Sequence, residues 1–263
     1  MYGMEKTVFF IAILILSLIP QAIAVGIPNE LYVTKWQGYG IEVIQGSSVV
    51  RSWAPSGSAE LAIVVDNTVK TYGYTNSGSK GAEYTLSGTY TGTQYTVNPA
   101  SYGFHDGATD GTYYYSWGYF SNSLEKFDKN WNRIETMFTL TGTDRLGVTY
   151  DPTDDTFWIT CWSQGRVEHY TRSGSLLGSF NTNTYSGMIA LDYTDNTLWT
   201  VVYSSNAFKQ YSKSGVLLQT VSVTGLNAGY IYGGEFRYLI PEPGTFVLLL
   251  LASLFCTLRF FKK

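Results

Sequence analysis

A repeat of about 42 residues constrains the fold of this chain more than any other feature of its sequence. The stretches 147–177 and 187–218 match at a spacing of 41 residues without a gap. The matched pairs are Asp151 and Asp192, Thr156 and Thr197, Trp158 and Trp199, Tyr170 and Tyr211, Ser173 and Ser214, Gly174 and Gly215, Leu176 and Leu217, and Leu177 and Leu218. Related patterns recur at twice this spacing in 121–127 and at three times this spacing in 31–36. Such a period is typical of a chain built from copies of one supersecondary unit.

Each unit contains four short segments with the pattern of β-strands. Apolar residues alternate with polar ones between turn residues, which is the period of a half-buried strand. The Asp-Asn-Thr of 66–68 and the Thr-Asp-Asp-Thr of 153–156 are typical of tight turns between a first and a second strand. Arg172, Ser173 and Gly174 are typical of a turn between a third and a fourth strand. Four antiparallel strands in roughly 40 to 45 residues have the size of one β-propeller blade.

The starts of the second strands indicate how many blades there are. They fall near Leu31, Val69, Tyr113, Phe157 and Leu198, at intervals of 38, 44, 44 and 41 residues. We therefore predict an all-β fold, a single β-propeller of five blades with four antiparallel strands each. Six blades are the less favoured alternative.

Two registers compete within 49–100. The stretch 74–78 resembles 170–174, which would move the second blade by one strand. The turn at 66–68 instead keeps the spacing even and leaves 90–97 as a fourth strand. We prefer this second register.

The two ends of the repeat region are expected to meet. The sequence ahead of Leu31 is too short for a first strand, whereas 228–230 matches 186–188. We predict that a strand near 229–233 completes the blade that begins at Leu31. Such closure removes the free sheet edges through which strands aggregate.

Residues 1–24 have the pattern of a secretory signal peptide. Lys6 precedes an apolar run of 12 residues, Val8 to Ile19, and Ala22 and Ala24 form a small-x-small cleavage site. The run is shorter than the ~20 residues of a membrane-spanning helix. We predict export through the Sec translocon and cleavage by signal peptidase after Ala24, with an uncleaved anchor as the alternative.

Residues 241–263 have the pattern of a membrane-inserted tail. Pro241, Glu242 and Pro243 precede an apolar segment, 245–261, whose 17 residues are at the short limit for a transmembrane helix. The prolines keep the tripeptide extended, because neither fits a helix interior. Cations at the end of the segment favour a cytoplasmic end by the positive-inside rule. These cations are Arg259, Lys262 and Lys263.

In these pieces and in their order, the tail resembles the PEP-CTERM sorting signal. The resemblance implies that an exosortase, a membrane-embedded cysteine transpeptidase, recognises the tripeptide and removes the tail. The protein would then lie transiently in the inner membrane through its C-terminal helix and reach the cell surface or the extracellular matrix of a bacterium that makes exopolysaccharide. An ordinary C-terminal membrane anchor is the alternative. The body, 25–240, resembles the broad YncE/NHL-like propeller group.

Low charge and a single body cysteine exclude several classes of function. Charged residues make up 14% of the chain, the formal net charge is -3, and no basic block lies in the interior. We therefore expect no nucleic-acid partner. Cys161 is the only cysteine of the body, which excludes a disulfide framework, and we interpret it as a partly buried strand residue.

The sequence contains no recognisable metal site. His105 and His169 lie on different predicted strands without the spacing of zinc ligands. Asp151, Asp154 and Asp155 could offer oxygen ligands to calcium, but the same turn recurs at 192–196. Turn chemistry explains a recurring aspartate better than a metal does. We expect no metal and no cofactor.

Catalysis is the less favoured interpretation of the body. It contains no G-x-S-x-G motif and no paired nucleophile and base, so we predict a non-enzyme. The alternative from the enzyme class is a propeller-type lyase or lactonase. Its scattered candidate residues are Glu42, Asp106 and Glu235.

Aromatic residues are the strongest indication of a binding site. The predicted loops between second and third strands open on one face of a propeller, and aromatic rings beside amides and hydroxyls suit the faces of sugars. The candidate ligand-face residues are Trp36, Tyr39, Trp117, Tyr119, Trp162 and Tyr203. The alternative is that the tryptophans pack between blades under the loops. The sequence thus favours an exported, non-catalytic protein that binds extracellular polysaccharide or a protein ligand, with a structural spacer as a further alternative.

Overall fold

The structure is a computed structural model that describes residues 26–36, 40–74, 79–99, 101–142, 144–227 and 230–238. The predicted signal peptide, the Pro-Glu-Pro tripeptide, the apolar tail with its cations, and Tyr39 lie outside these residues. Within them, no helix has the length and apolar character needed to cross a membrane.

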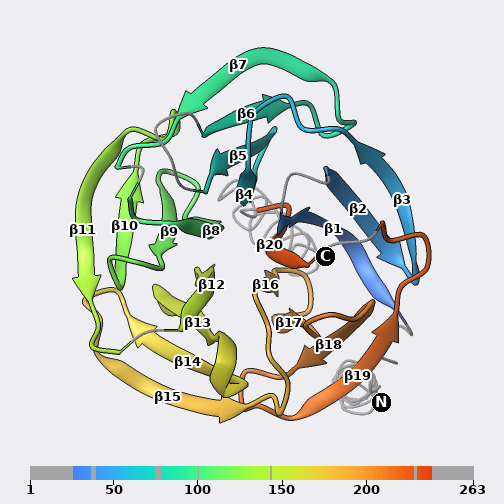
Figure 1. The fold of residues 1–263 in the computed structure, drawn as a ribbon. Coiled ribbons are helices and arrows are strands. Elements are labelled where there is room, and N and C mark those ends of the chain that lie inside the picture. Colours follow the sequence, from blue (N-terminus) through green and yellow to red (C-terminus); the bar gives the residue numbers. More distant parts are fainter. Residues whose placement is uncertain are drawn as a thin grey trace, which may run out of the picture.

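Five four-stranded antiparallel sheets surround a central axis, which confirms the predicted five-bladed propeller (Figure 1). Named from the inner to the outer strand, blade 1 contains β20 (Ile231–Phe236), β1 (Ile27–Lys35), β2 (Ile41–Gly46) and β3 (Ser48–Trp53). Blade 2 contains β4 (Glu60–Val65), β5 (Val69–Gly73), β6 (Lys80–Tyr84) and β7 (Tyr90–Thr96). Blade 3 contains β8 (Phe104–Thr109), β9 (Tyr114–Gly118), β10 (Ser123–Phe127) and β11 (Arg133–Thr139).

The last two blades are the pair in which the repeat is clearest. Blade 4 contains β12 (Arg145–Asp151), β13 (Thr156–Cys161), β14 (Arg166–Thr171) and β15 (Leu176–Asn181), with the 3-10 helix η2 (Trp162–Gln164) between β13 and β14. Blade 5 contains β16 (Ile189–Asp192), β17 (Thr197–Val201), β18 (Ala207–Tyr211) and β19 (Leu217–Ser222).

Burial along the strands follows their distance from the axis. The inner strand β4 is buried at every position, whereas the outer strand β7 is exposed at six of seven. One apolar cluster lies at each of the five junctions between neighbouring blades, and the junction of blades 3 and 4 includes Trp117, Phe157 and Ile159. Stability therefore comes from contacts between blades, as repeat architectures require.

The preferred register of the second blade agrees with the observed pairing. The turn at 66–68 connects β4 to β5, and Val65 pairs with Val69 across it. The fourth strand of this blade is β7, within the predicted range 90–97.

Blade 1 combines strands from both ends of the chain. β20 pairs antiparallel with β1, and Val33 lies opposite Gly234. The sequence placed this strand near 229–233, and the structure places it at 231–236. Position 233 requires glycine, because a Cβ atom there would lie 2.1 Å from the carbonyl oxygen of Leu61 in the neighbouring blade.

The antiparallel strands give the propeller two different ends. The loops between second and third strands and the connections between blades lie at one end, which we call the loop face. The turns between first and second and between third and fourth strands lie at the other, which we call the hairpin face. Both described ends of the blade 1 pairing, Gly26 before β1 and Tyr238 after β20, belong to the hairpin face.

On the hairpin face, aspartates of the first turns bind the next blade. Each aspartate accepts backbone N–H groups within its own turn, as Asp66 Oδ1 does from the N–H of Thr68 at 3.1 Å. Three of the four also pair with a cation from the following blade. These cross-blade ion pairs are Lys129 Nζ with Asp66 Oδ2 at 3.6 Å, Arg172 Nη2 with Asp110 Oδ2 at 3.0 Å, and Lys213 Nζ with Asp151 Oδ2 at 2.5 Å. Asn29 takes the cation's place at Asp192 with two hydrogen bonds of 3.0 and 2.9 Å.

Candidate functional site

Every blade places an aromatic residue after its second strand on the loop face. One residue follows the second strand of each blade, and each of the five side chains is half-buried. They are Trp36, Tyr74, Tyr119, Trp162 and Tyr203. The fivefold repetition follows from the repeat, since the same loop recurs once in each blade.

Four rings from this face surround His105. The imidazole lies 4.6 Å from the ring of Tyr74, 5.5 Å from that of Tyr119 and 5.4 Å from that of Tyr232. Trp36 lies 6.2 Å away, nearly parallel to the imidazole at 10°. His105 is the second residue of β8 and only 4% exposed, so it forms the floor of this group.

The remaining rings continue from this group towards blades 4 and 5. Tyr203 stacks on Tyr230 at 4.6 Å and 14°, and it contacts Trp162 edge-on at 5.3 Å. Trp162 in turn lies 5.7 Å from Tyr185. A contact of 6.4 Å between Tyr203 and Tyr232 joins these rings to the group around His105.

Together these rings form one continuous surface, which we call the aromatic face. Three of its members are well exposed, Tyr230 at 41%, Tyr185 at 50% and Phe120 at 57%, the last lying 5.2 Å from Tyr119. The aromatic face consists of Trp36, Tyr74, His105, Tyr119, Phe120, Trp162, Tyr185, Tyr203, Tyr230 and Tyr232.

Trp117 does not belong to the aromatic face, which corrects one sequence-based candidate. Its side chain is fully buried in the cluster between blades 3 and 4 and lies 6.2 Å from Phe138. Trp117 is still within β9, where side chains alternate between the two faces of the sheet, and its own face packs against blade 4. Tyr119, two residues later, has left the strand and contacts His105.

Four of the six candidates, Trp36, Tyr119, Trp162 and Tyr203, do meet on the aromatic face, and Tyr39 lies outside the described residues. Tyr74 was not among the predicted residues, although it follows the second strand β5 as the other four rings follow theirs. The prediction from sequence also missed the rings at the starts of inner strands or in the connections between blades. These are His105, Tyr185, Tyr230 and Tyr232.

The centre of the aromatic face is uncharged at neutral pH. Burial lowers the pKa of His105 to about 3, so its imidazole stays neutral. Burial raises the pKa of Tyr74, and burial together with a hydrogen bond that Tyr232 donates to Tyr203 raises the pKa of Tyr232. These rings therefore present apolar faces and neutral hydrogen-bonding groups to a ligand.

Beside the aromatic face, Glu42 is engaged in a buried ion pair. Its Oε2 lies 2.6 Å from Lys35 Nζ, and both side chains are 1% exposed. Lys35 donates to the carbonyl oxygen of Asn227 at 2.7 Å, and the Asn227 N–H donates to Glu42 Oε1 at 2.9 Å. The pair thus fixes the backbone of Asn227.

Asp106 and Glu235 lie at the centre of the propeller and are fully buried. Burial raises the pKa of both, and the charge of Asp106 raises that of Glu235 further. Four backbone N–H groups from four inner strands oppose the shift at Asp106 and occupy its carboxylate. Their donor–acceptor distances are 3.0 Å from Gly107, 3.2 Å from Val148, 3.1 Å from Ile189 and 2.9 Å from Gly234.

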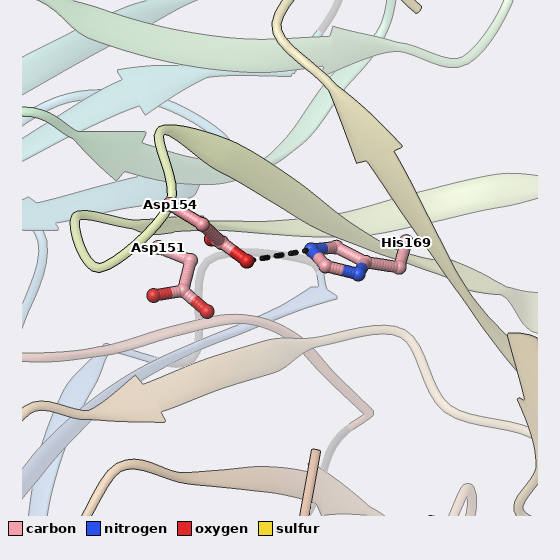
Figure 2. A group of neighbouring side chains, drawn as sticks. All are labelled: Asp151, Asp154 and His169. Carbon is pink, nitrogen blue, oxygen red and sulfur yellow. Dashed lines mark ion pairs between the residues drawn. The ribbon is translucent and has the colours of Figure 1, made fainter. Parts of the chain in front are cut away.

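The hairpin face of blade 4 brings Asp151, Asp154 and His169 together, and one ligand atom of each lies within 4.8 Å of the others (Figure 2). His169 Nε2 is 3.9 Å from Asp154 Oδ2, the pair marked in Figure 2. Asp151, however, already binds the ammonium group of Lys213 at 2.5 Å. The cluster therefore holds a protein cation between blades 4 and 5, and Asp155 likewise pairs with Arg172 at 2.5 Å.

Cys161 lies on a strand, as predicted, at the end of β13, and its side chain is fully rather than partly buried. Burial and the nearby Glu168 carboxylate raise the pKa of its thiol to about 12. The thiolate that would act as a nucleophile is therefore scarce at neutral pH.

No known family profile and no curated protein matches this sequence. Among solved structures, a chain of the nidogen/laminin complex has a TM-score of 0.55 at 12% identity and covers 80% of this chain and 99% of its own. A protein of unknown function from Bacteroides caccae has a TM-score of 0.51 at 12% identity, covering 77% of each chain. A streptogramin B lyase has a TM-score of 0.46 at 15% identity, covering 74% of this chain and 60% of its own. The likeness to the first two structures shows the β-propeller fold.

Proposed function

We propose that this protein is an exported, non-catalytic binding protein whose propeller holds a carbohydrate on the aromatic face. The observation that carries the proposal is that all five blades contribute a ring after the second strand, and that these rings join into one partly exposed surface. Sugars offer apolar C–H faces that stack on such rings and hydroxyl groups that bond to neighbouring phenols and amides.

The carboxylates support binding rather than catalysis. A lyase or lactonase needs acidic or imidazole groups that converge at an opening to reach the substrate. The Asp106 carboxylate instead accepts hydrogen bonds from four backbone N–H groups, and Glu42 forms an ion pair with Lys35. Of the enzyme candidates, none offers a free carboxylate on the aromatic face.

Export and exosortase processing form the second half of the proposal. They rest on the signal-like residues 1–24, on Pro241, Glu242 and Pro243, and on the apolar tail that follows. Tyr238 is the last described residue, and only two residues separate it from Pro241. At about 3.5 Å per extended residue, Pro241 can lie no further than about 10 Å from Tyr238 at the hairpin face. A membrane attachment there leaves the aromatic face, at the opposite end, free for a ligand.

Binding can be tested with affinity electrophoresis in gels that contain soluble polysaccharides. A Trp162→Ala, Tyr203→Ala double variant should bind about tenfold more weakly, because each stacked ring contributes about 0.5–1.5 kcal/mol. Tyr90→Ala is the matched control, since Tyr90 is an exposed aromatic on the outer strand β7, away from the aromatic face. Equal retardation of the double variant and the control would overturn carbohydrate binding at this face.

Processing can be tested by intact-mass measurement of the protein from a host that has an exosortase. We expect a mature chain that starts at Val25 and ends near Pro241, and we expect replacement of Pro241 and Pro243 by alanine to prevent the loss of the tail. A wild-type chain that still ends at Lys263 in that host would contradict the sorting proposal.

A further inference from the structure

His105 is the one heteroaromatic nitrogen base within the aromatic face. It lies at the start of the inner strand β8. The rings of Trp36 and Tyr232 approach it from blade 1, that of Tyr74 from blade 2, and that of Tyr119 from its own blade. Its side chain is 4% exposed. A polar group placed so deeply among rings sets the orientation of whatever lies over it, because its hydrogen bond has few alternatives.

The protonation of the His105 ring follows from one hydrogen bond. Nδ1 lies 3.1 Å from the carbonyl oxygen of Gly103, which can only accept, so Nδ1 carries the hydrogen and donates it. Nε2 therefore has a free lone pair and acts as an acceptor. Among the residues that the structure describes, no donor reaches Nε2.

The surroundings of His105 do not suit an anionic ligand. The titratable groups in contact with its ring are the phenols of Tyr74, Tyr119 and Tyr232, and none of them is a cation. The charged residues at the ends of neighbouring strands, Lys35 and Glu42, bind each other. A carboxylate would meet ring faces, which carry negative charge, and the Nε2 lone pair, which repels it.

We propose that His105 Nε2 accepts a hydrogen bond from a hydroxyl group of the ligand, and that the ligand is accordingly a neutral polysaccharide rather than one rich in uronic acids. This inference rests on the proposed carbohydrate binding and adds the ligand's charge class and the residue that orients it. The aromatic rings supply stacking area, and His105 supplies a buried acceptor at their centre.

Binding of three probes by His105 variants of the full chain tests the inference. The probes are a soluble β-glucan, a galactomannan and alginate, measured by affinity electrophoresis. His105→Phe keeps a flat ring but removes the acceptor, and His105→Gln restores a side-chain acceptor. We expect about tenfold weaker binding of a neutral glycan by His105→Phe and a smaller loss for His105→Gln.

The control is His169→Gln, on the hairpin face. Gln210 fills the equivalent position in the next repeat and donates to Thr197, as His169 contacts Thr156, so the substitution copies a side chain that the fold already uses. This control should bind as the wild type does. Wild-type binding by His105→Phe, or preference of the wild type for alginate, would overturn the inference.

A second measurement covers the case in which His105→Phe fails to fold. In the wild-type protein, the 15N chemical shift of His105 Nε2 should move when a neutral glycan is added, while Nδ1 stays protonated. An unmoved Nε2 under saturating glycan would contradict the inference. Failure of carbohydrate binding as a whole is recognised separately, because the Trp162→Ala, Tyr203→Ala variant would then bind every probe as the wild type does.

Discussion

Asp106 holds the centre of the propeller through its carboxylate. Its two oxygens accept N–H groups from β8, β12, β16 and β20, so one side chain joins the inner strands of four blades. A carboxylate that accepts several backbone N–H groups makes charge-assisted hydrogen bonds, which are stronger than neutral ones. Asp106 therefore fixes the positions of these four inner strands relative to one another around the central axis.

Replacing Asp106 by asparagine should destabilise the fold by about 2–4 kcal/mol. The amide keeps the shape of the carboxyl, but its NH2 group faces backbone donors instead of accepting from them. Urea unfolding followed by circular dichroism measures the change. An unfolding midpoint equal to that of the wild type would show that the four hydrogen bonds do not stabilise the native state.

His105 should make the fold sensitive to acid. Burial lowers its pKa in the folded protein to about 3, from 6.5 in the absence of structure. Below pH 6.5 the unfolded state therefore binds a proton at His105 that the folded state does not bind. The free energy of unfolding falls as the pH drops from 6.5 towards 3, by at most about 1.4 kcal/mol per pH unit.

The comparison that isolates this effect is wild type against His105→Gln in urea unfolding between pH 4 and pH 7. Buried carboxyls titrate in both proteins and cancel in the difference. The phenols of Tyr74 and Tyr232, which contact the imidazole, stay protonated in this range because burial raises the pKa of both. Parallel pH profiles would contradict the lowered pKa.

At the residue scale, the limit of prediction from sequence is visible at Trp117 and Tyr119. The sequence placed both near the end of a second strand, and the two differ only in whether the strand has ended. That boundary depends on packing against blade 4, which buries Trp117 completely. Local sequence predicts that a strand exists more reliably than where it stops.

At the scale of elements, the aspartates in the turns of the hairpin face make two kinds of contact. They cap their own turn, and they bind a cation or an amide from the next blade. The contact within the turn is local, so a recurring aspartate in the sequence predicts it. The contact between blades joins residues about 62 positions apart, such as Asp151 and Lys213, and it depends on how the neighbouring blades are arranged around the ring.

Removing the Lys213 ammonium should cost about 1–3 kcal/mol of stability, because it leaves the Asp151 carboxylate, 0% exposed, without its cation. Lys213→Ala tests this in urea unfolding, and Lys80→Ala is the control, since Lys80 is exposed. The control should stay within about 0.5 kcal/mol of the wild type. Equal effects of the two substitutions would mean that the cross-blade ion pair does not stabilise the propeller.

At the scale of the whole molecule, β20 decides whether the ring closes. It supplies the inner strand of blade 1 and brings Phe236 into the cluster between blades 5 and 1. The repeat predicted such closure because blade 1 lacked a first strand ahead of Leu31. The arrangement of the aromatic face could not be predicted in the same way, since it depends on which loops reach the axis.

Truncation after Tyr230 should therefore abolish the cooperative fold. The shortened chain lacks β20, exposes the edge of β1 and loses Phe236 from its cluster. Truncation after Ile240 removes only the tail and should keep a cooperative unfolding transition. If both truncated chains unfold alike in a thermal scan, closure by β20 is not what stabilises the ring.

The account as a whole depends on where a sugar binds. The most direct measurement is a crystal structure of the protein with a short neutral oligosaccharide. We expect the sugar on the loop face, stacked on rings such as Trp36 and Tyr203, with a hydroxyl group within hydrogen-bond distance of His105 Nε2. A sugar bound on the hairpin face, or an aromatic face left empty at saturating oligosaccharide, would contradict it.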